Sequence, residues 1–404
     1  MIPLHRPPFG LGTVIRSVVA SRESSSERRL EEAYAEAAGC RCAVWLPSAR
    51  AGICWALAES VAKDTRVLAP AFTCAVVHEA VARSGAQLTV LDAAADDFLV
   101  QPATLSPPEA RNWGVVLCEL YGHAYELAGP SAVADTAAVR VIDMALSVPH
   151  PSLFKRLREN DFAVISFGKG KTMYAGWGAM GFTGDRALAD AVRRRRDAIT
   201  TRSNAKLGLR RTVNVFLRTA AHYPTVYSLA RKLRERVPAS KHREIPMNQP
   251  VYALLNDRSM SAEWRLPLTH SDRALALWNV QRATDMWHTR LALASRYEAN
   301  LRNSKNISLP KPSASALSHY TIRLNSEIRS AVKDRLFHGG VHTVTLWAFS
   351  QHLEKEQYPN ALRLSNEVLN LPLSPWMTRS QVDQVCEALI RAVEDIKRDS
   401  SAAG

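Results

Sequence analysis

Two lysines stand in a glycine-rich stretch, SFGKGKTMYAGWG at residues 166–178, directly after an apolar run typical of a buried strand. Lys169 and Lys171 are candidate reactive groups, because a lysine amine held in a fixed place adds to carbonyl carbons. Asp143 closes the apolar run VRVID, and a carboxylate in such a buried place requires a cationic partner. Ser166 adds a hydroxyl where the run before the lysines ends. We therefore expect an amine, a carboxylate and a hydroxyl at one end of a sheet.

This set of groups is what a protein needs to hold pyridoxal phosphate. The lysine forms a Schiff base with the aldehyde, the aspartate keeps the ring nitrogen protonated, and hydroxyls with helix N-terminal amides bind the phosphate. Residue types alone leave a second interpretation open, because strand-end aspartates often cap helices and lysines in glycine-rich turns are usually solvated. A P-loop is excluded, since no GxxxxGK[ST] occurs.

No metal site is expected. The stretch HGGVH at residues 338–342 has the spacing of a zinc-binding pair, but its two glycines would break the helix that must present both imidazoles on one face. Cys40 and Cys42 stand without a second Cys or His pair that would complete a tetrahedral site.

The elements that must position these groups alternate along the chain. Short apolar runs typical of strands buried on both faces occur at residues 66–70, 87–91, 113–121, 140–143 and 161–167. Helix-like segments separate most of these runs, and the segments 49–63 and 74–83 carry apolar residues at helical spacing. The pattern predicts an α/β fold with a mostly parallel sheet, in which ligands bind beyond the carboxyl ends of the strands. A second, smaller segment begins near residue 265 and opens with a long helical stretch at 274–302.

The net charge of +14 is concentrated in one segment. Residues 193–243 hold fifteen Lys or Arg against two acids, a local charge of +13 in 51 residues. This concentration argues against nucleic-acid binding by the whole molecule and for one basic surface that faces a nucleotide diphosphate, a membrane or a polyanionic glycan. A solvated helical face remains the alternative. No apolar run is long enough to span a bilayer and no secretory signal is seen, so we expect a cytoplasmic enzyme.

Taken in order, the motifs resemble the DegT/DnrJ/EryC1/StrS family of pyridoxal-phosphate-dependent sugar aminotransferases, which have fold type I. The resemblance covers residues 45–395. Any one of the matching stretches is a weak signal, but six in the family's order are a strong one. They are LPSARAGICWAL (46–57), VLAPAFTCAVVHEAVARSGAQLTVLDA (67–93), CELYGHAYEL (118–127), VIDMALS (141–147), SFGKGKTMYAGWGAMGFTGD (166–185) and ALRLSNEVLNLPLSPWMTRSQVDQV (361–385).

The resemblance implies a role for each candidate residue. Lys171 falls on the Schiff-base lysine, while Lys169 occupies a variable position beside it. Asp143 falls on the aspartate that pairs with the pyridine nitrogen, and Ser166 on a phosphate-binding serine. Ala49 and Arg50 fall on the Gly-Thr pair at the N-terminus of the phosphate-binding helix.

The chain also departs from the family pattern. Arg50 replaces a Thr with a longer cation still able to reach a phosphate, Cys74 replaces the aromatic that stacks on the cofactor, and Leu146 replaces a Gln or His near the ring oxygen. Three functions therefore stay open. The first is an aminotransferase acting on a nucleotide-linked keto sugar, the second a dehydratase or a non-sugar aminotransferase, and the third a non-catalytic binding module. Lys171 argues against a dehydratase, because such family members typically carry His there.

The resemblance further implies a homodimer with active sites at the subunit interface, and an amino donor such as glutamate. We expect a large cofactor-binding domain at residues 1–250, including a basic helical insert at 193–243, and a small C-terminal domain at 251–404. Through its arginines and aromatics the insert could also touch a membrane surface.

Overall fold

The structure is a computed structural model of the 404-residue chain. The residues it describes are 1–19, 26–95, 98–100, 112–127, 136–223, 225–227, 262–350 and 352–402. The predicted basic insert is thus described up to residue 223 and at 225–227, and the rest of it lies outside the described residues. The predicted domain boundary at residue 250 lies outside them too, so the division into 1–250 and 251–404 stays a prediction.

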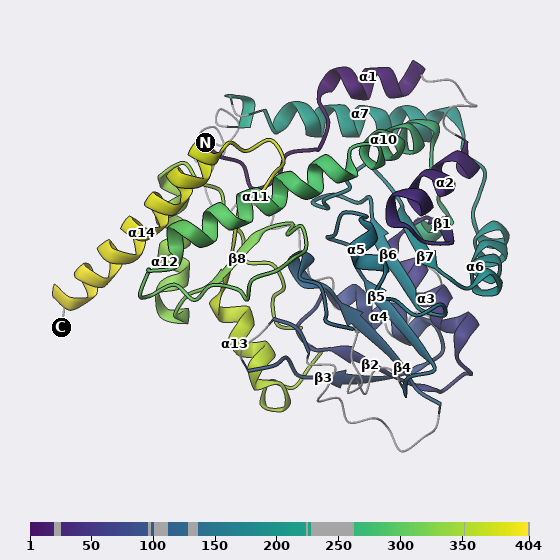
Figure 1. Cartoon of the computed structure of the whole chain (residues 1–404), viewed down its shortest axis with the longest axis horizontal. Helices are drawn as coiled ribbons and strands as arrows, with labels where there is room; N and C mark the ends of the chain where they lie inside the picture. The colour runs from purple at the N-terminus through teal and green to yellow at the C-terminus, as the bar shows by residue number, and fades with distance from the viewer. Residues whose placement is uncertain are drawn as a thin grey trace.

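A seven-stranded sheet forms the centre of the large unit, with the strand order β1-β7-β6-β5-β4-β2-β3 (Figure 1). Its strands are β1 (Cys42–Leu46), β2 (Arg66–Pro70), β3 (Gln87–Leu91), β4 (Gly114–Cys118), β5 (Val139–Asp143), β6 (Phe162–Ser166) and β7 (Ala179–Thr183). Neighbouring strands are parallel except where β7 pairs with β1 and β6. The predicted mostly parallel sheet is confirmed, with β2 and β3 at the expected residues, while β1 and β7 were not anticipated.

Strands β4, β6 and β7 are buried along their whole length, which indicates that helices cover both faces of the sheet. The helices of the large unit are α1 (Leu11–Val19), α2 (Glu27–Ala38), α3 (Ala49–Ser60), α4 (Ala75–Arg83), α5 (Pro151–Phe154), α6 (Arg186–Ile199), α7 (Ala205–Ala221) and α10 (His270–Val280). None of the helices in the described part of the chain is both long and apolar enough to cross a bilayer.

Helix α3 lies unusually close to the sheet. Ser48 caps its N-terminus by accepting a hydrogen bond from the Ala51 N–H at 3.1 Å. A Cβ at Gly52 would lie 2.5 Å from a methyl of Leu46 on β1 and 3.4 Å from one of Val164 on β6. Glycine is therefore required for the first turn of α3 to approach the sheet where β6 ends.

The C-terminal part of the chain builds a second buried cluster around a two-stranded antiparallel sheet. Its elements are α11 (Ala283–Leu301), β8 (Tyr320–Arg323), α12 (Ser326–His338), α13 (Pro359–Glu367), β9 (Val368–Leu371) and α14 (Arg379–Ala402). The predicted helical stretch at 274–302 is divided into α10 and α11. The division falls at Gln281 and Arg282, where the Arg282 guanidinium stacks 3.9 Å from the centre of the Trp278 ring.

The first residues of the chain lie against this C-terminal unit (Figure 1). Ile2 forms a β-bridge with Val341, and the indole of Trp376 donates a 2.7 Å hydrogen bond to the carbonyl of Pro7. Helix α1 then turns back and runs beside α7 on the large unit (Figure 1). The N-terminal segment therefore connects the two buried clusters.

Much of the charge in the described part of the insert is paired within the fold. Residues 193–223 contain nine Lys or Arg, and four of them form ion pairs with acids far away in the sequence. These pairs are Arg193–Glu31, Arg195–Glu59, Arg196–Glu31 and Arg211–Asp272. The local surplus read from the sequence is thus reduced by acids from α2, α3 and α10, so it is not all available to an external anion.

Candidate active site

The seven predicted site residues line one cavity of about 250 Å³ at the carboxyl edge of the sheet. Asp143 is the last residue of β5 and Ser166 the last of β6, and these strands are parallel neighbours. Their side chains therefore meet at the same edge. Lys171 follows from the turn after β6. Ala49, Arg50, Cys74 and Leu146 complete the set.

Lys171 is positioned by a turn that its own glycines make possible. The Phe167 N–H donates to the Gly178 carbonyl at 2.8 Å, and the Ala175 N–H to the Phe167 carbonyl at 3.0 Å, which closes the loop at its base. Gly178 has φ 96°, in the region that favours glycine. Inside the loop, the Lys171 N–H donates to Gly168 at 3.2 Å. The amine thus projects from a closed loop rather than from a solvated tail.

The carboxylate of Asp143 accepts a 2.9 Å hydrogen bond from the Ala145 N–H. Burial raises the pKa of this carboxyl, while the charge of Lys171 and that hydrogen bond lower it. A desolvated carboxylate of this kind binds a cationic N–H strongly. Asp143 is therefore suited to a protonated ring nitrogen.

The other end of the cavity offers donors to an anion. Ala49 and Arg50 are the first two residues of α3, so their backbone N–H groups have no acceptor within the helix. The N-terminus of a helix attracts phosphate through these groups and through the helix dipole. Ser166 contributes its hydroxyl, which accepts a 3.2 Å hydrogen bond from the Gly168 N–H.

The Arg50 side chain has a protein partner. Its Nη1 lies 3.0 Å from Oε2 of Glu79, whose side chain is fully buried, and Nε of Arg83 lies 2.9 Å from the other carboxylate oxygen. That the Arg50 cation also reaches a phosphate stays a prediction, as does the role of its backbone N–H.

The two other departures from the family pattern lie on the cavity wall. Cys74 is the N-cap residue of α4 and makes no capping hydrogen bond with its side chain. Leu146 is buried, and its carbonyl accepts a 2.6 Å hydrogen bond from the Thr172 hydroxyl. This bond ties the lysine loop to the segment that follows β5 and Asp143.

Two further wall residues were not among the predicted site residues. The Lys171 amine lies 5.7 Å from the centre of the Trp347 ring, which supplies an aromatic surface although Cys74 does not. Glu119 follows β4 directly, is buried and pairs with Arg156. Burial raises the pKa of Glu119, although Arg156 lowers it. The position of Glu119 at a strand end was the signal that could have identified it.

These groups fit pyridoxal phosphate. The cavity presents an amine for the aldehyde, a buried carboxylate for the ring nitrogen, and helix N–H groups with a hydroxyl for the phosphate. Among the described residues, no group of His, Cys, Asp or Glu side chains is arranged to hold a metal ion.

Fold and site together define a pyridoxal-phosphate-dependent transferase of fold type I. The chain belongs to the DegT/DnrJ/EryC1/StrS aminotransferase family, whose sequence pattern matches residues 12–210 and 262–390. The predicted family, fold, enzyme class and cofactor are thereby confirmed. The roles of the individual residues stay predictions.

Similar proteins agree with this assignment. The erythromycin biosynthesis sensory transduction protein EryC1 of Saccharopolyspora erythraea is 25% identical over 348 residues, which cover 82% of this chain and 80% of EryC1. The sugar aminotransferase CalS13 of Micromonospora echinospora has the same fold, with a TM-score of 0.68, 17% identity, and coverage of 97% of this chain and 100% of CalS13. NtdA of Bacillus subtilis, solved with its bound cofactor PMP, gives a TM-score of 0.70 at 16% identity, covering 97% of this chain and 84% of NtdA.

Proposed function

We propose that this aminotransferase moves an amino group from an amino acid donor, such as glutamate, to the keto group of a nucleotide-linked sugar. The observation that carries the proposal is the meeting of Lys171, Asp143 and Ser166 in one cavity. The similarity to EryC1 and to the sugar aminotransferase CalS13 supports a sugar acceptor.

Each residue of the cofactor cavity has a proposed role that follows from its position. When bound, pyridoxal phosphate supplies a carbonyl carbon that takes up the amino group and a ring that withdraws electrons. The Lys171 amine would bind that carbon and, once released, carry a proton between the donor's α-carbon and C4′. Asp143 would keep a proton on the ring nitrogen. Ser166 and the N–H groups of Ala49 and Arg50 would hold the phosphate and so fix the orientation.

The proposal extends to the setting of the enzyme. We infer a cytoplasmic homodimer that works in the assembly of a surface polysaccharide or a glycosylated natural product. Closed twofold symmetry is the commonest state of soluble homo-oligomers. Light scattering at micromolar protein concentration tests this, and a single-chain mass close to 44.7 kDa would contradict the dimer.

The function is tested with the cofactor-loaded enzyme. Adding glutamate is expected to shift the absorbance of the bound cofactor. A nucleotide-linked keto sugar added afterwards is expected to restore the original absorbance, and mass spectrometry should then detect an amino sugar. A spectrum that responds to glutamate but transfers only to simple keto acids would assign a non-sugar aminotransferase. A protein that binds no cofactor would be a binding module of the same fold.

A further inference from the structure

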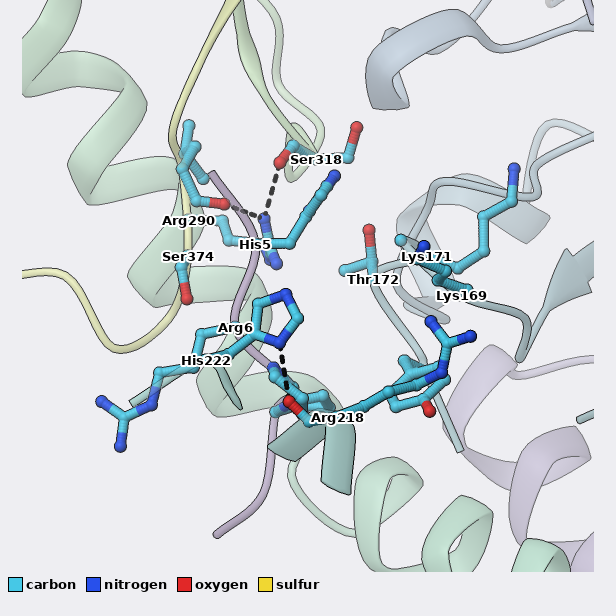
Figure 2. A pocket seen from close by; sticks show the side chains of 15 residues that line it. His5, Arg6, Lys169, Lys171, Thr172, Arg218, His222, Arg290, Ser318 and Ser374 are labelled. Carbon is cyan, nitrogen blue, oxygen red and sulfur yellow. Dashed lines mark hydrogen bonds between the residues drawn. The ribbon is translucent and has the colours of Figure 1, made fainter. Parts of the chain in front are cut away.

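A second cavity, of about 70 Å³, is lined in part by the lysine loop (Figure 2). Lys171 lines this cavity as well as the cofactor cavity. Figure 2 shows His5, Arg290 and Ser318 on one side, Lys169 and Thr172 facing them, and His222 and Arg218 below. The walls come from the N-terminal segment, the lysine loop, the end of α7, α11 and the loops beside β8 and β9, so both buried clusters contribute.

The described lining is rich in cations and holds no acid. Five of its fifteen residues are Lys or Arg, none is Asp or Glu, and none of the five forms an ion pair with a carboxylate in the described part of the chain. They are Arg6, Lys169, Lys171, Arg218 and Arg290. Like charges around a small cavity raise its potential and attract an anion. Burial, and then the charge of Arg218, lower the pKa of Lys169.

Arg290 is the most deeply placed of these cations, with 6% of its surface exposed. Its Nη1 donates to the carbonyls of Leu317, Ser318 and Leu373 at 3.0, 3.2 and 2.7 Å, while its Nε is buried without a partner in the described structure. Carbonyls orient a guanidinium but leave its charge in place, and a buried charge is costly until it is compensated. Burial accordingly lowers the pKa of Arg290 to about 9.

Two of the other cations, Arg218 and Arg6, are also held by neighbours. Arg218 Nε donates to the Asn214 side chain at 2.5 Å on α7. The Arg6 guanidinium sits 4.9 Å from the Tyr223 ring and 4.8 Å from the Trp376 ring. Such stacking suits a guanidinium and fixes its plane. The positive charge is therefore arranged before any ligand arrives.

The size of the cavity limits the ligand. Its volume is about 70 Å³, against about 250 Å³ for the cofactor cavity. A cavity of this size suits a small ligand such as one tetrahedral oxyanion. Hydroxyls of Thr172, Ser318 and Ser374 on the wall add neutral partners for its oxygens.

We propose that this cavity binds one phosphate group, either free inorganic phosphate or a phosphate of the acceptor substrate. The second source rests on the proposed function, whereas the first does not. Arginine and lysine donors bind phosphate through charge-assisted hydrogen bonds. Because Lys171 lines both cavities, the bound phosphate would lie directly behind the loop that carries the lysine.

Calorimetric titration of the cofactor-loaded enzyme with inorganic phosphate tests the site, because the cofactor then fills the other anion-binding place. Lys169→Met and Arg218→Gln are each expected to weaken phosphate binding about tenfold or more. The matched control is Arg210→Gln, which removes an exposed charge from the same helix α7 and should leave the affinity unchanged. Thermal unfolding of each variant verifies that the fold is intact.

Two outcomes would overturn the proposal: no measurable phosphate binding at low ionic strength, or the same affinity in wild type and both variants. UDP and dTDP, with uridine and thymidine as uncharged controls, then identify the source. Competition between a nucleoside diphosphate and phosphate supports the substrate, and phosphate binding without competition supports free phosphate. The titration requires no turnover. The phosphate-site proposal can therefore be contradicted while amino transfer is observed, and phosphate binding can be observed while the proposed amino transfer is not.

Discussion

Arg50 and Glu79 form an ion pair of 3.0 Å at the edge of the cofactor cavity, with the Glu79 side chain fully buried. Arg83 binds the second oxygen of the same carboxylate at 2.9 Å. One carboxylate thus compensates two guanidiniums, and a single surplus positive charge remains at the start of α3. The N-terminus of this helix can attract a phosphate without presenting a bare arginine to it.

Replacing Glu79 should therefore destabilise the protein. Glu79→Gln keeps the size of the side chain but removes the buried negative charge that binds both Arg50 and the largely buried Arg83, and we expect the unfolding free energy to fall by about 3 kcal/mol or more. Urea unfolding measures it. The control is Glu59→Gln, which breaks the more exposed pair with Arg195 and should cost no more than about 1 kcal/mol. Equal effects of the two changes would contradict the buried-pair argument.

Lys171, and not Lys169, should carry the cofactor. Lys171 lines the cofactor cavity, together with Asp143 and Ser166. Of the cofactor cavity and the second cavity, Lys169 lines the second alone. Lys171→Ala is expected to abolish the absorbance of lysine-bound cofactor and all amino transfer, while Lys169→Ala keeps the absorbance. Borohydride reduction followed by peptide mass spectrometry locates the pyridoxyl group. Finding it on Lys169, or on no lysine after cofactor was supplied, would sink the assignment.

Asp143→Ala should separate cofactor binding from turnover. The phosphate-binding groups and Lys171 remain, so part of the cofactor stays bound, but the ring nitrogen loses the carboxylate that holds its proton. We expect kcat to fall by about 10²-fold or more. Cofactor occupancy from absorbance and kcat from product formation are measured on the same sample. A variant with wild-type kcat would show that Asp143 does not face the ring nitrogen.

Acid pH should weaken the fold through His78. Burial lowers its pKa to about 4, despite the 2.8 Å hydrogen bond to the Pro70 carbonyl. The unfolded chain takes up this proton below about pH 6.5, whereas the folded chain does so only near its own lower pKa. The unfolding free energy should therefore fall between pH 6.5 and 4, by up to about 1.4 kcal/mol per pH unit from this residue.

The variant His78→Gln should flatten that dependence in urea unfolding at pH 7, 6 and 5. His338→Gln is the control, because His338 is exposed near the end of α12 and should not alter the slope. A slope that is the same in His78→Gln and wild type would show that His78 does not contribute to it.

The features that could be predicted from the sequence are those set by residues close together along the chain. β2 and β3 are continuous apolar runs and were located to the residue, and Asp143 and Ser166 meet because ends of parallel neighbours share an edge. β7, with the sequence AMGFT, follows two glycines and reads like part of the turn before it. Its strand structure depends on pairing with β1 and β6.

The partners of charged residues could not be found in this way. Glu79 reaches Arg50 from another helix, 29 residues away in sequence. The three arginines of the second cavity, Arg6, Arg218 and Arg290, are far apart in the sequence and share no local pattern. The basic insert shows the converse, because its dense charge is partly neutralised by acids such as Glu31 and Asp272 that only the fold brings near.

The place of β1 in the sheet has a consequence for synthesis on the ribosome. Within the described residues β1 pairs with β7 alone, and Cys42 faces Thr183, which lies 141 residues later in the chain. At roughly 5–20 residues per second, translation needs roughly 7–28 s to deliver that partner. Throughout this interval the nascent CAVWL segment is an apolar strand without a neighbour, exposed to chaperones and to other chains.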